Sequence, residues 1–117
     1  MKILNNQRFD TIELETYNDW LYVKLNRPKS KNALSSVMIT ELINLINLAE
    51  SQQFLRGILL SGKGGCFCSG ADLKEFKFFF SSGKPNRNEI ISSSLNVAKL
   101  LKSFYQFPKY VIACIDG

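Results

Sequence analysis

Two short apolar runs limit the folds that this chain can adopt more than any other feature. Residues 57–61 read GILLS and residues 110–115 read YVIACI. Runs of this length without polar alternation are typical of inner strands of a parallel sheet, which are covered on both faces. Apolar residues at helical spacing precede each run: Met38, Leu42, Leu45, Ile46 and Ala49 before the first, and Ile90, Ile91, Leu95, Ala98, Leu101 and Tyr105 before the second. This alternation of helix and strand predicts an α/β fold with parallel pairing.

The first part of the chain predicts a β-hairpin. Residues 11–17 and 20–25 alternate between apolar and polar side chains, and Asn18-Asp19 between them is a turn signal. Ser35 or Ser36 can cap the first helix, and Pro108 ends the second. The expected order is therefore hairpin, helix, strand, glycine-rich turn, helix and strand. Because the chain has 117 residues without repeat or linker, we expect residues 1–117 to form a single domain.

Charge and residue types exclude several function classes. The net charge is +5, from 15 basic and 10 acidic residues. The basic residues are scattered along the sequence, which argues against a nucleic-acid-binding stripe. The positive net charge then serves either ordinary solubility or the attraction of an anionic ligand such as a phosphorylated cofactor. The chain has no histidine, so it contains neither a Ser-His-Asp nor a Cys-His triad, and no metal site is expected.

The cysteines and the lack of a recognisable targeting signal bear on the cellular compartment in which the protein is expected. Cys66, Cys68 and Cys114 are an odd number and do not form a metal-binding pattern. They favour a reducing, intracellular setting, in the cytoplasm or an organelle matrix. Residues 1–10 lack the apolar core of a signal peptide, and no stretch approaches the about 18 apolar residues of a membrane span. We therefore expect no membrane partner.

A glycine-rich turn follows the first apolar run. Residues 62–76 read GKGGCFCSGADLKEF and lead into a predicted helix start. Such a turn exposes backbone N–H groups, which can hold a phosphate or a negative oxygen that develops during a reaction. Gly57, Gly62 and Lys63 match part of a phosphate-loop pattern, but the next residue is Gly64 in place of Ser or Thr. The four residues between the glycines also look like a strand, so nucleotide hydrolysis is disfavoured.

Three motifs in this order resemble the enoyl-CoA hydratase/isomerase (crotonase) superfamily. FCSGADLKE at 67–75 is similar to its oxyanion loop, LNRPKSKNAL at 25–34 to its first coenzyme A-binding turn, and KYVIACIDG at 109–117 to the strand that enters its second glycine-rich segment. The similarity covers roughly residues 11–117. It implies a crotonase-like ββα spiral fold, of which this chain is the N-terminal part, incomplete at the C-terminus.

The resemblance also implies a site. Family members bind a thioester carbonyl with two backbone N–H groups, which stabilise an enolate, and the first of these catalytic donors corresponds to Ala71. Asp72 would have a structural role at a helix start. Phe76, Phe78, Phe79 and Phe80 would wall the acyl pocket or pack in the core. The implied coenzyme A-binding set is Arg27, Lys29, Lys31, Ala33, Ser69, Gly70, Ala71, Asp72, Leu73 and Lys74. Coenzyme A is expected as part of the substrate, without a tightly bound cofactor.

The implied activity is hydration of 2-enoyl-CoA, with double-bond isomerisation or a non-catalytic coenzyme A-binding or interaction fragment as alternatives. The family's second donor and catalytic carboxylates correspond to positions beyond residue 117. Glu75 and Glu89 are not at family catalytic positions. We therefore expect the 117-residue chain alone to be inactive. The resemblance also implies that full-length relatives form homo-oligomers, either trimers or hexamers.

Overall fold

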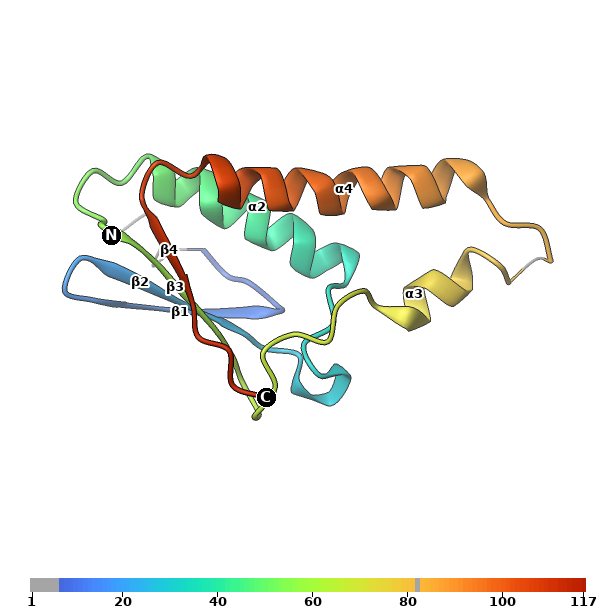
Figure 1. The fold of residues 1–117 in the computed structure, drawn as a ribbon, viewed down its shortest axis with the longest axis horizontal. Coiled ribbons are helices and arrows are strands. Elements are labelled where there is room, and N and C mark those ends of the chain that lie inside the picture. The colour runs from blue at the N-terminus through green and yellow to red at the C-terminus, as the bar shows by residue number, and fades with distance from the viewer. Residues whose placement is uncertain (1–6, 82) are drawn as a thin grey trace.

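A four-stranded mixed sheet forms the centre of the computed structural model, which describes residues 7–81 and 83–117. Its strands are β1 (Ile12–Tyr17), β2 (Trp20–Leu25), β3 (Gly57–Gly62) and β4 (Tyr110–Ala113), and they lie in the order β1-β2-β3-β4 (Figure 1). β1 and β2 are antiparallel, whereas β2, β3 and β4 are parallel to one another. This architecture confirms the predicted α/β fold with parallel pairing.

The β1–β2 hairpin forms where the sequence predicts it. Asn18 and Asp19 have φ angles of 46° and 68°. Two consecutive left-handed residues are typical of a two-residue hairpin turn, whose twist matches that of the flanking strands. Leu21, Val23 and Leu25 of β2 are all buried. The alternating pattern therefore assigned the inner face of this strand correctly.

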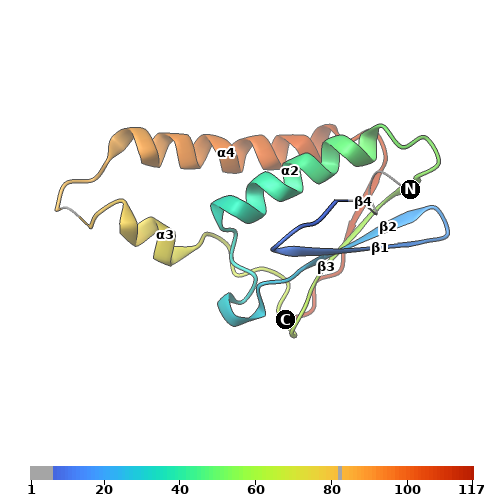
Figure 2. The same cartoon turned by 180° about the vertical axis from the view of Figure 1, so that it is seen from behind.

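Two long helices lie on one side of the sheet, and a short third helix lies beyond its end (Figure 1). They are α2 (Ser36–Glu50), α3 (Leu73–Phe78) and α4 (Arg87–Gln106), preceded by the 3₁₀ turn η1 (Pro28–Ser30). The Ser35 hydroxyl accepts a hydrogen bond from the Met38 N–H at 3.2 Å, so Ser35 is the N-cap of α2. α2 packs over the sheet and α4 runs beside α2, as the front and back views show (Figures 1 and 2). α2 buries Met38, Ile39, Leu42, Ile43, Leu45, Ile46 and Ala49.

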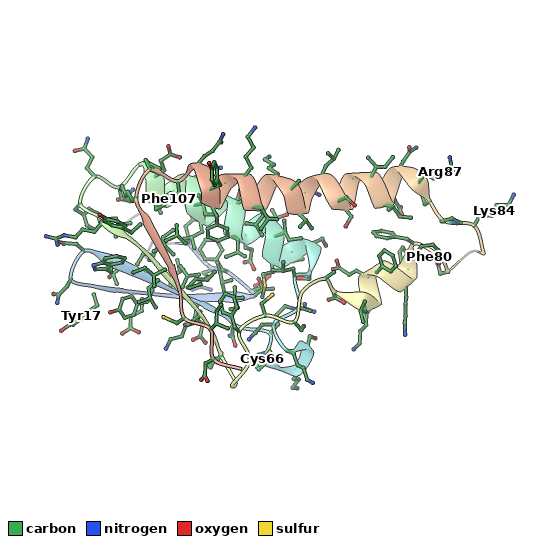
Figure 3. The ribbon with its side chains drawn as sticks, viewed as in Figure 1. Tyr17, Cys66, Phe80, Lys84, Arg87 and Phe107 are labelled. Carbon is green, nitrogen blue, oxygen red and sulfur yellow. The ribbon has the colours of Figure 1, made fainter. Side chains whose placement is uncertain are left out.

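The apolar spacing before the second run predicted a helix, and α4 confirms it, but most of the residues that carry this spacing do not face the core. Ile91, Leu95, Leu101 and Tyr105 are exposed, and Tyr105 is 90% accessible. The side that packs on the core instead contains the buried Leu100, with Val97 and Phe104 beside it. α4 has two apolar stripes, and periodicity alone does not show which of them faces α2. Phe107 then closes the core where α4 leads into β4 (Figure 3).

The second apolar run is also only partly as predicted. β3 is an inner strand with a parallel neighbour on each side, and its Ile58 is 1% exposed. β4 is shorter than the predicted 110–115 and lies at the edge of the sheet, and all its residues are exposed. An apolar run indicates that a strand can be covered on both faces, but it does not specify what covers it. Within the described part of the chain, no strand pairs with the outer edge of β4.

The described residues contain neither a candidate membrane-spanning helix nor a cluster of metal-ligating side chains. Among residues 7–81 and 83–117, no helix has the length and apolar character needed to cross a membrane. In the same ranges, no three His, Cys, Asp or Glu side chains gather as a metal would require.

Candidate functional site

The two segments that carry the strongest sequence resemblance lie side by side. Leu34 forms an isolated parallel bridge with Ala71, and the Leu34 N–H donates to the Gly70 carbonyl at 2.8 Å. The Ser69 N–H donates to the Lys31 carbonyl at 3.0 Å. The turn after β2 and the glycine-rich turn after β3 therefore form one structural unit, although more than 30 residues separate them.

Asn32 fastens these turns together, and the sequence analysis missed it. Its side chain is fully buried. Oδ1 accepts from the Arg27 N–H at 2.8 Å, and Nδ2 donates to the carbonyls of Lys63 and Cys66 at 3.0 and 2.6 Å. Its φ of 55° is left-handed, a conformation that asparagine adopts more readily than most residues. The available signal was an asparagine in a polar turn, which is too common to single out.

Arg27 and Asp72 form a second connection. One guanidinium nitrogen of Arg27 lies 3.0 Å from Asp72 Oδ2, and the other donates to the Ala33 carbonyl at 2.6 Å. Asp72 Oδ1 accepts from the N–H groups of Lys74 and Glu75, so Asp72 is the N-cap of α3. Burial raises the pKa of Asp72, but the Glu75 N–H, Arg27 and the Lys74 N–H outweigh it, and the pKa is lower than usual. Asp72 is therefore a charged structural anchor of the site.

The glycine-rich turn leaves one backbone donor open. A Cβ at Gly62 would collide with the Cys66 and Phe67 carbonyls, and Gly70 has a φ of 100°. The Gly70 N–H points to the Cys68 sulfur at 3.4 Å, and the Gly70 carbonyl accepts from Leu34. Within the described residues, the N–H of the exposed Ala71 donates to no acceptor.

Two hollows share the lining residues Ala71 and Asp72. The first, here called the polar hollow, measures about 360 Å³, and the second, the aromatic pocket, measures about 470 Å³. The polar hollow is lined by Lys29, Ser30, Ala33, Ser69, Ala71, Asp72, Leu73 and Lys74.

Most of the expected coenzyme A contacts therefore line one hollow. Arg27, Lys31 and Gly70 are the exceptions. Arg27 is occupied by Asp72 and the Ala33 carbonyl, and the Lys31 and Gly70 carbonyls accept hydrogen bonds within the turns. Their contact with coenzyme A stays a prediction, as does that of the residues lining the hollow.

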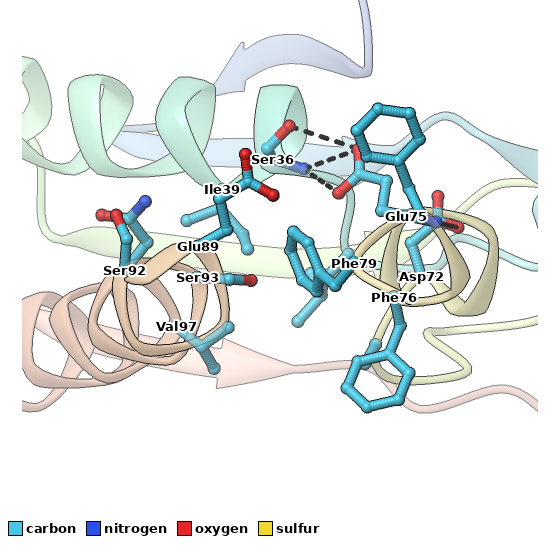
Figure 4. A pocket seen from close by; sticks show the side chains of 14 residues that line it. Ser36, Ile39, Asp72, Glu75, Phe76, Phe79, Glu89, Ser92, Ser93 and Val97 are labelled. Carbon is cyan, nitrogen blue, oxygen red and sulfur yellow. Dashed lines mark hydrogen bonds between the residues drawn. The ribbon is translucent and has the colours of Figure 1, made fainter. Parts of the chain in front are cut away.

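The aromatic pocket lies between α3 and α4. Phe76 and Phe79 come from the α3 side, and Ser93 and Val97 from α4 (Figure 4). The Glu75 carboxylate accepts from the Ser36 N–H at 3.0 Å and from its hydroxyl at 3.2 Å, which ties α3 to the first turn of α2.

Three of the four phenylalanines lie in the aromatic pocket, and the fourth is exposed beside it. Phe76, Phe78 and Phe79 line the pocket. Phe80 is outside the lining and packs on Phe76, with 5.2 Å between ring centroids.

Comparison with known proteins gives one consistent result. The family model described as enoyl-CoA hydratase/isomerase matches residues 15–117. The human mitochondrial enoyl-CoA hydratase domain-containing protein 2 is 33% identical over 96 residues, which are 81% of this chain and 31% of that protein.

Solved structures agree with the sequence comparison. Pseudomonas aeruginosa AtuE superposes with a TM-score of 0.86 at 27% identity, over 92% of this chain and 41% of that one. Enoyl-CoA hydratase from Bacillus anthracis superposes with a TM-score of 0.82 at 28% identity, over 92% and 40%. This chain thus spans about a third of the human relative and two fifths of these structures. The matches confirm the crotonase-like fold that the motifs implied, and the chain belongs to the enoyl-CoA hydratase/isomerase family.

Proposed function

We propose that this chain binds the thioester of an acyl-CoA and that it contributes this binding to the hydration of a 2-enoyl-CoA, a reaction that also needs carboxylates at other positions. The observation that carries the proposal is the position of the Ala71 N–H. Among the described residues it has no hydrogen-bond acceptor, and it lies on an exposed residue that lines both hollows. A thioester carbonyl at Ala71 would have its coenzyme A side in the polar hollow and its acyl chain in the aromatic pocket.

The chemistry of each hollow fits this arrangement. Lys29 and Lys74 line the polar hollow and supply positive charge for the phosphates of coenzyme A. Phenylalanine side chains line the aromatic pocket, whose volume is in the range of small-molecule sites. Addition of water to a conjugated double bond puts negative charge on the thioester oxygen. A fixed N–H directed at that oxygen contributes on the order of 3 kcal/mol to the transition state.

The two carboxylates that follow Ala71 in the sequence are each held by another residue, so they do not favour turnover. Asp72 is paired with Arg27, and Glu75 is held by Ser36. Neither is free to move a proton to or from a substrate, and the third carboxylate of the lining, Glu89, comes from α4 on the other side of the pocket (Figure 4). We therefore propose that residues 1–117 alone bind acyl-CoA without converting it. Isomerisation passes through the same enolate at the same donor, so carboxylates at other positions decide between the two reactions.

A change of one backbone atom tests the role of Ala71. Ligation at Cys68 gives access to a chain in which an ester oxygen replaces the Ala71 N–H. We expect calorimetry to show crotonyl-CoA binding to the all-amide chain and about five- to tenfold weaker binding to the ester chain, the effect of one hydrogen bond. An all-amide chain made by the same ligation is the control.

Three results would count against the proposal. Absence of crotonyl-CoA binding to the all-amide chain would remove the acyl-CoA assignment. Equal binding by the two chains would remove Ala71 as the donor. Hydration of crotonyl-CoA by the 117-residue chain, followed through loss of the enoyl absorbance, would show that these residues are sufficient for turnover.

A further inference from the structure

The wall that α4 gives to the aromatic pocket is polar. Glu89, Ser92, Ser93 and Asn96 all line the pocket. Their spacing of i, i+3, i+4 and i+7 places them on a single stripe of the helix. The exposed apolar residues Ile91, Leu95 and Leu101 are on the rest of the helix surface. Part of α4 thus presents hydrogen-bonding groups to a pocket and leaves apolar side chains outside.

The carboxylate of Glu89 is the strongest acceptor on this stripe. Among the described residues, no hydrogen bond or ion pair engages it, whereas Glu75 across the pocket is held by Ser36. Figure 4 shows Glu89 on α4 with its carboxylate directed toward the first turn of α2, beside Ile39. An apolar ligand placed here would take water from the carboxylate without replacing its hydrogen bonds, which is unfavourable.

The opposite wall suits a hydrocarbon segment. Asp72, next to Ala71, lies on the α3 side, and Phe79 stands between α3 and α4 (Figure 4). An acyl chain that begins at Ala71 would lie among aromatic and aliphatic side chains, including Leu34 and Phe79, with the polar stripe of α4 on the other side of the pocket (Figure 4). The pocket therefore combines phenylalanine side chains from the α3 side with hydrogen-bonding side chains from α4.

We propose that the acyl group bound here carries a hydrogen-bond donor, a hydroxyl or an ammonium group, several carbons from the thioester, and that Glu89 accepts from it. This inference rests on the acyl-CoA binding proposed above and adds the substrate class. Ser92, Ser93 and Asn96 supply further hydrogen-bonding groups around the donor. A terminal carboxylate on the acyl group is excluded from the preferred ligands, because it would face the Glu89 charge.

Four ligands of matched length test the proposal by calorimetry with the complete 117-residue chain: hexanoyl-CoA, ω-hydroxyhexanoyl-CoA, ω-aminohexanoyl-CoA and adipoyl-CoA. We expect the amino ligand to bind about tenfold tighter than hexanoyl-CoA, and the hydroxy ligand several-fold tighter. Adipoyl-CoA should bind most weakly. The amino and hydroxy arms show which donor the pocket prefers.

Variants locate the effect at Glu89. Glu89→Gln should abolish the preference for the amino ligand. It should bind hexanoyl-CoA at least as tightly as the unmodified chain does, because an apolar acyl chain would no longer take water from a charged group. Glu50→Gln is the matched control, because it removes the same charge from the exposed last residue of α2, outside the pocket lining. It should leave the preference intact.

The outcomes separate the two proposals. If hexanoyl-CoA binds and the other three ligands bind equally well or less tightly, the donor inference is overturned while acyl-CoA binding stands. If the preference survives in Glu89→Gln, Glu89 is not the acceptor and the inference is likewise overturned. If none of the four ligands binds, the acyl-CoA assignment fails, and this inference fails with it.

Discussion

Replacement of Asp72 separates two interactions that its carboxylate makes at the candidate site. One oxygen caps α3, and the other pairs with Arg27, whose side chain is 24% exposed. Asparagine is itself a good N-cap, so Asp72→Asn removes mainly the charge beside Arg27. We expect a loss of about 1.5 kcal/mol in the free energy of unfolding, the low end for a hydrogen bond to a charged group. Asp72→Ala should lose about 1 kcal/mol more, because the cap is lost as well.

The effect of Asp72→Asn depends on pH in a defined direction. The pKa of Asp72 is lowered in the folded chain, because hydrogen bonds from Glu75, Arg27 and Lys74 outweigh the opposing effect of burial. A carboxylate of this kind stabilises the fold fully above its unfolded pKa of about 3.9, and the contribution disappears as the pH falls through its folded pKa. The difference between wild type and Asp72→Asn should therefore be constant near neutral pH and shrink below about pH 4.

Urea unfolding followed by tryptophan fluorescence measures this difference. Trp20 is the single tryptophan, and its ring stacks on Tyr110 across β3 with 6.3 Å between centroids, so it reports on the sheet. Asp116→Asn, at an exposed carboxylate, is the control and should change stability by less than about 0.5 kcal/mol. If the deficit of Asp72→Asn stays constant down to about pH 2, the charge of Asp72 does not stabilise the fold and the argument is refuted.

Three further substitutions test other parts of the structure. Asn32→Ala should lower the free energy of unfolding in urea by about 3 kcal/mol, because buried hydrogen-bonding groups lose their partners. Asn32→Gly should lower it less, because glycine accepts the left-handed φ. Equal losses in the two variants would contradict the role of φ. Gly62→Ala should displace the turn and speed the reaction of Cys66 and Cys68 with a thiol reagent, whereas unchanged rates would show that the turn tolerates a Cβ. Ile112→Lys, on the exposed β4 edge, should reduce concentration-dependent light scattering with stability unchanged, and equal scattering would mean that this edge does not drive association.

Local signals in the sequence were sufficient for the elements that depend on local interactions. Asn18-Asp19 predicted the hairpin turn, because few residues accept two left-handed conformations in succession. The Ser35 cap and the apolar spacing of α2 predicted that helix, because both act within a few residues. The glycine-rich turn predicted an exposed backbone donor for the same reason.

Contacts between distant segments were not predictable in this way. Asn32 donates to carbonyl groups more than 30 residues away, and the residues near it in the sequence do not predict those partners. The ion pair between Arg27 and Asp72 also forms only when the two turns meet. It competes with the expected contact of Arg27 with a phosphate of coenzyme A. The core-facing side of α4 was not predictable for a similar reason, because packing against α2 selects one of two apolar stripes.

The spatial order of the strands has a consequence for how the sheet is built. Each strand pairs with the one synthesised just before it, since β1, β2, β3 and β4 are neighbours in chain order. The hairpin can therefore serve as a template for β3, and β3 for β4, without any strand being inserted between two others. We expect the sheet to grow in one direction, from the N-terminal hairpin outward, with β4 as its growing end.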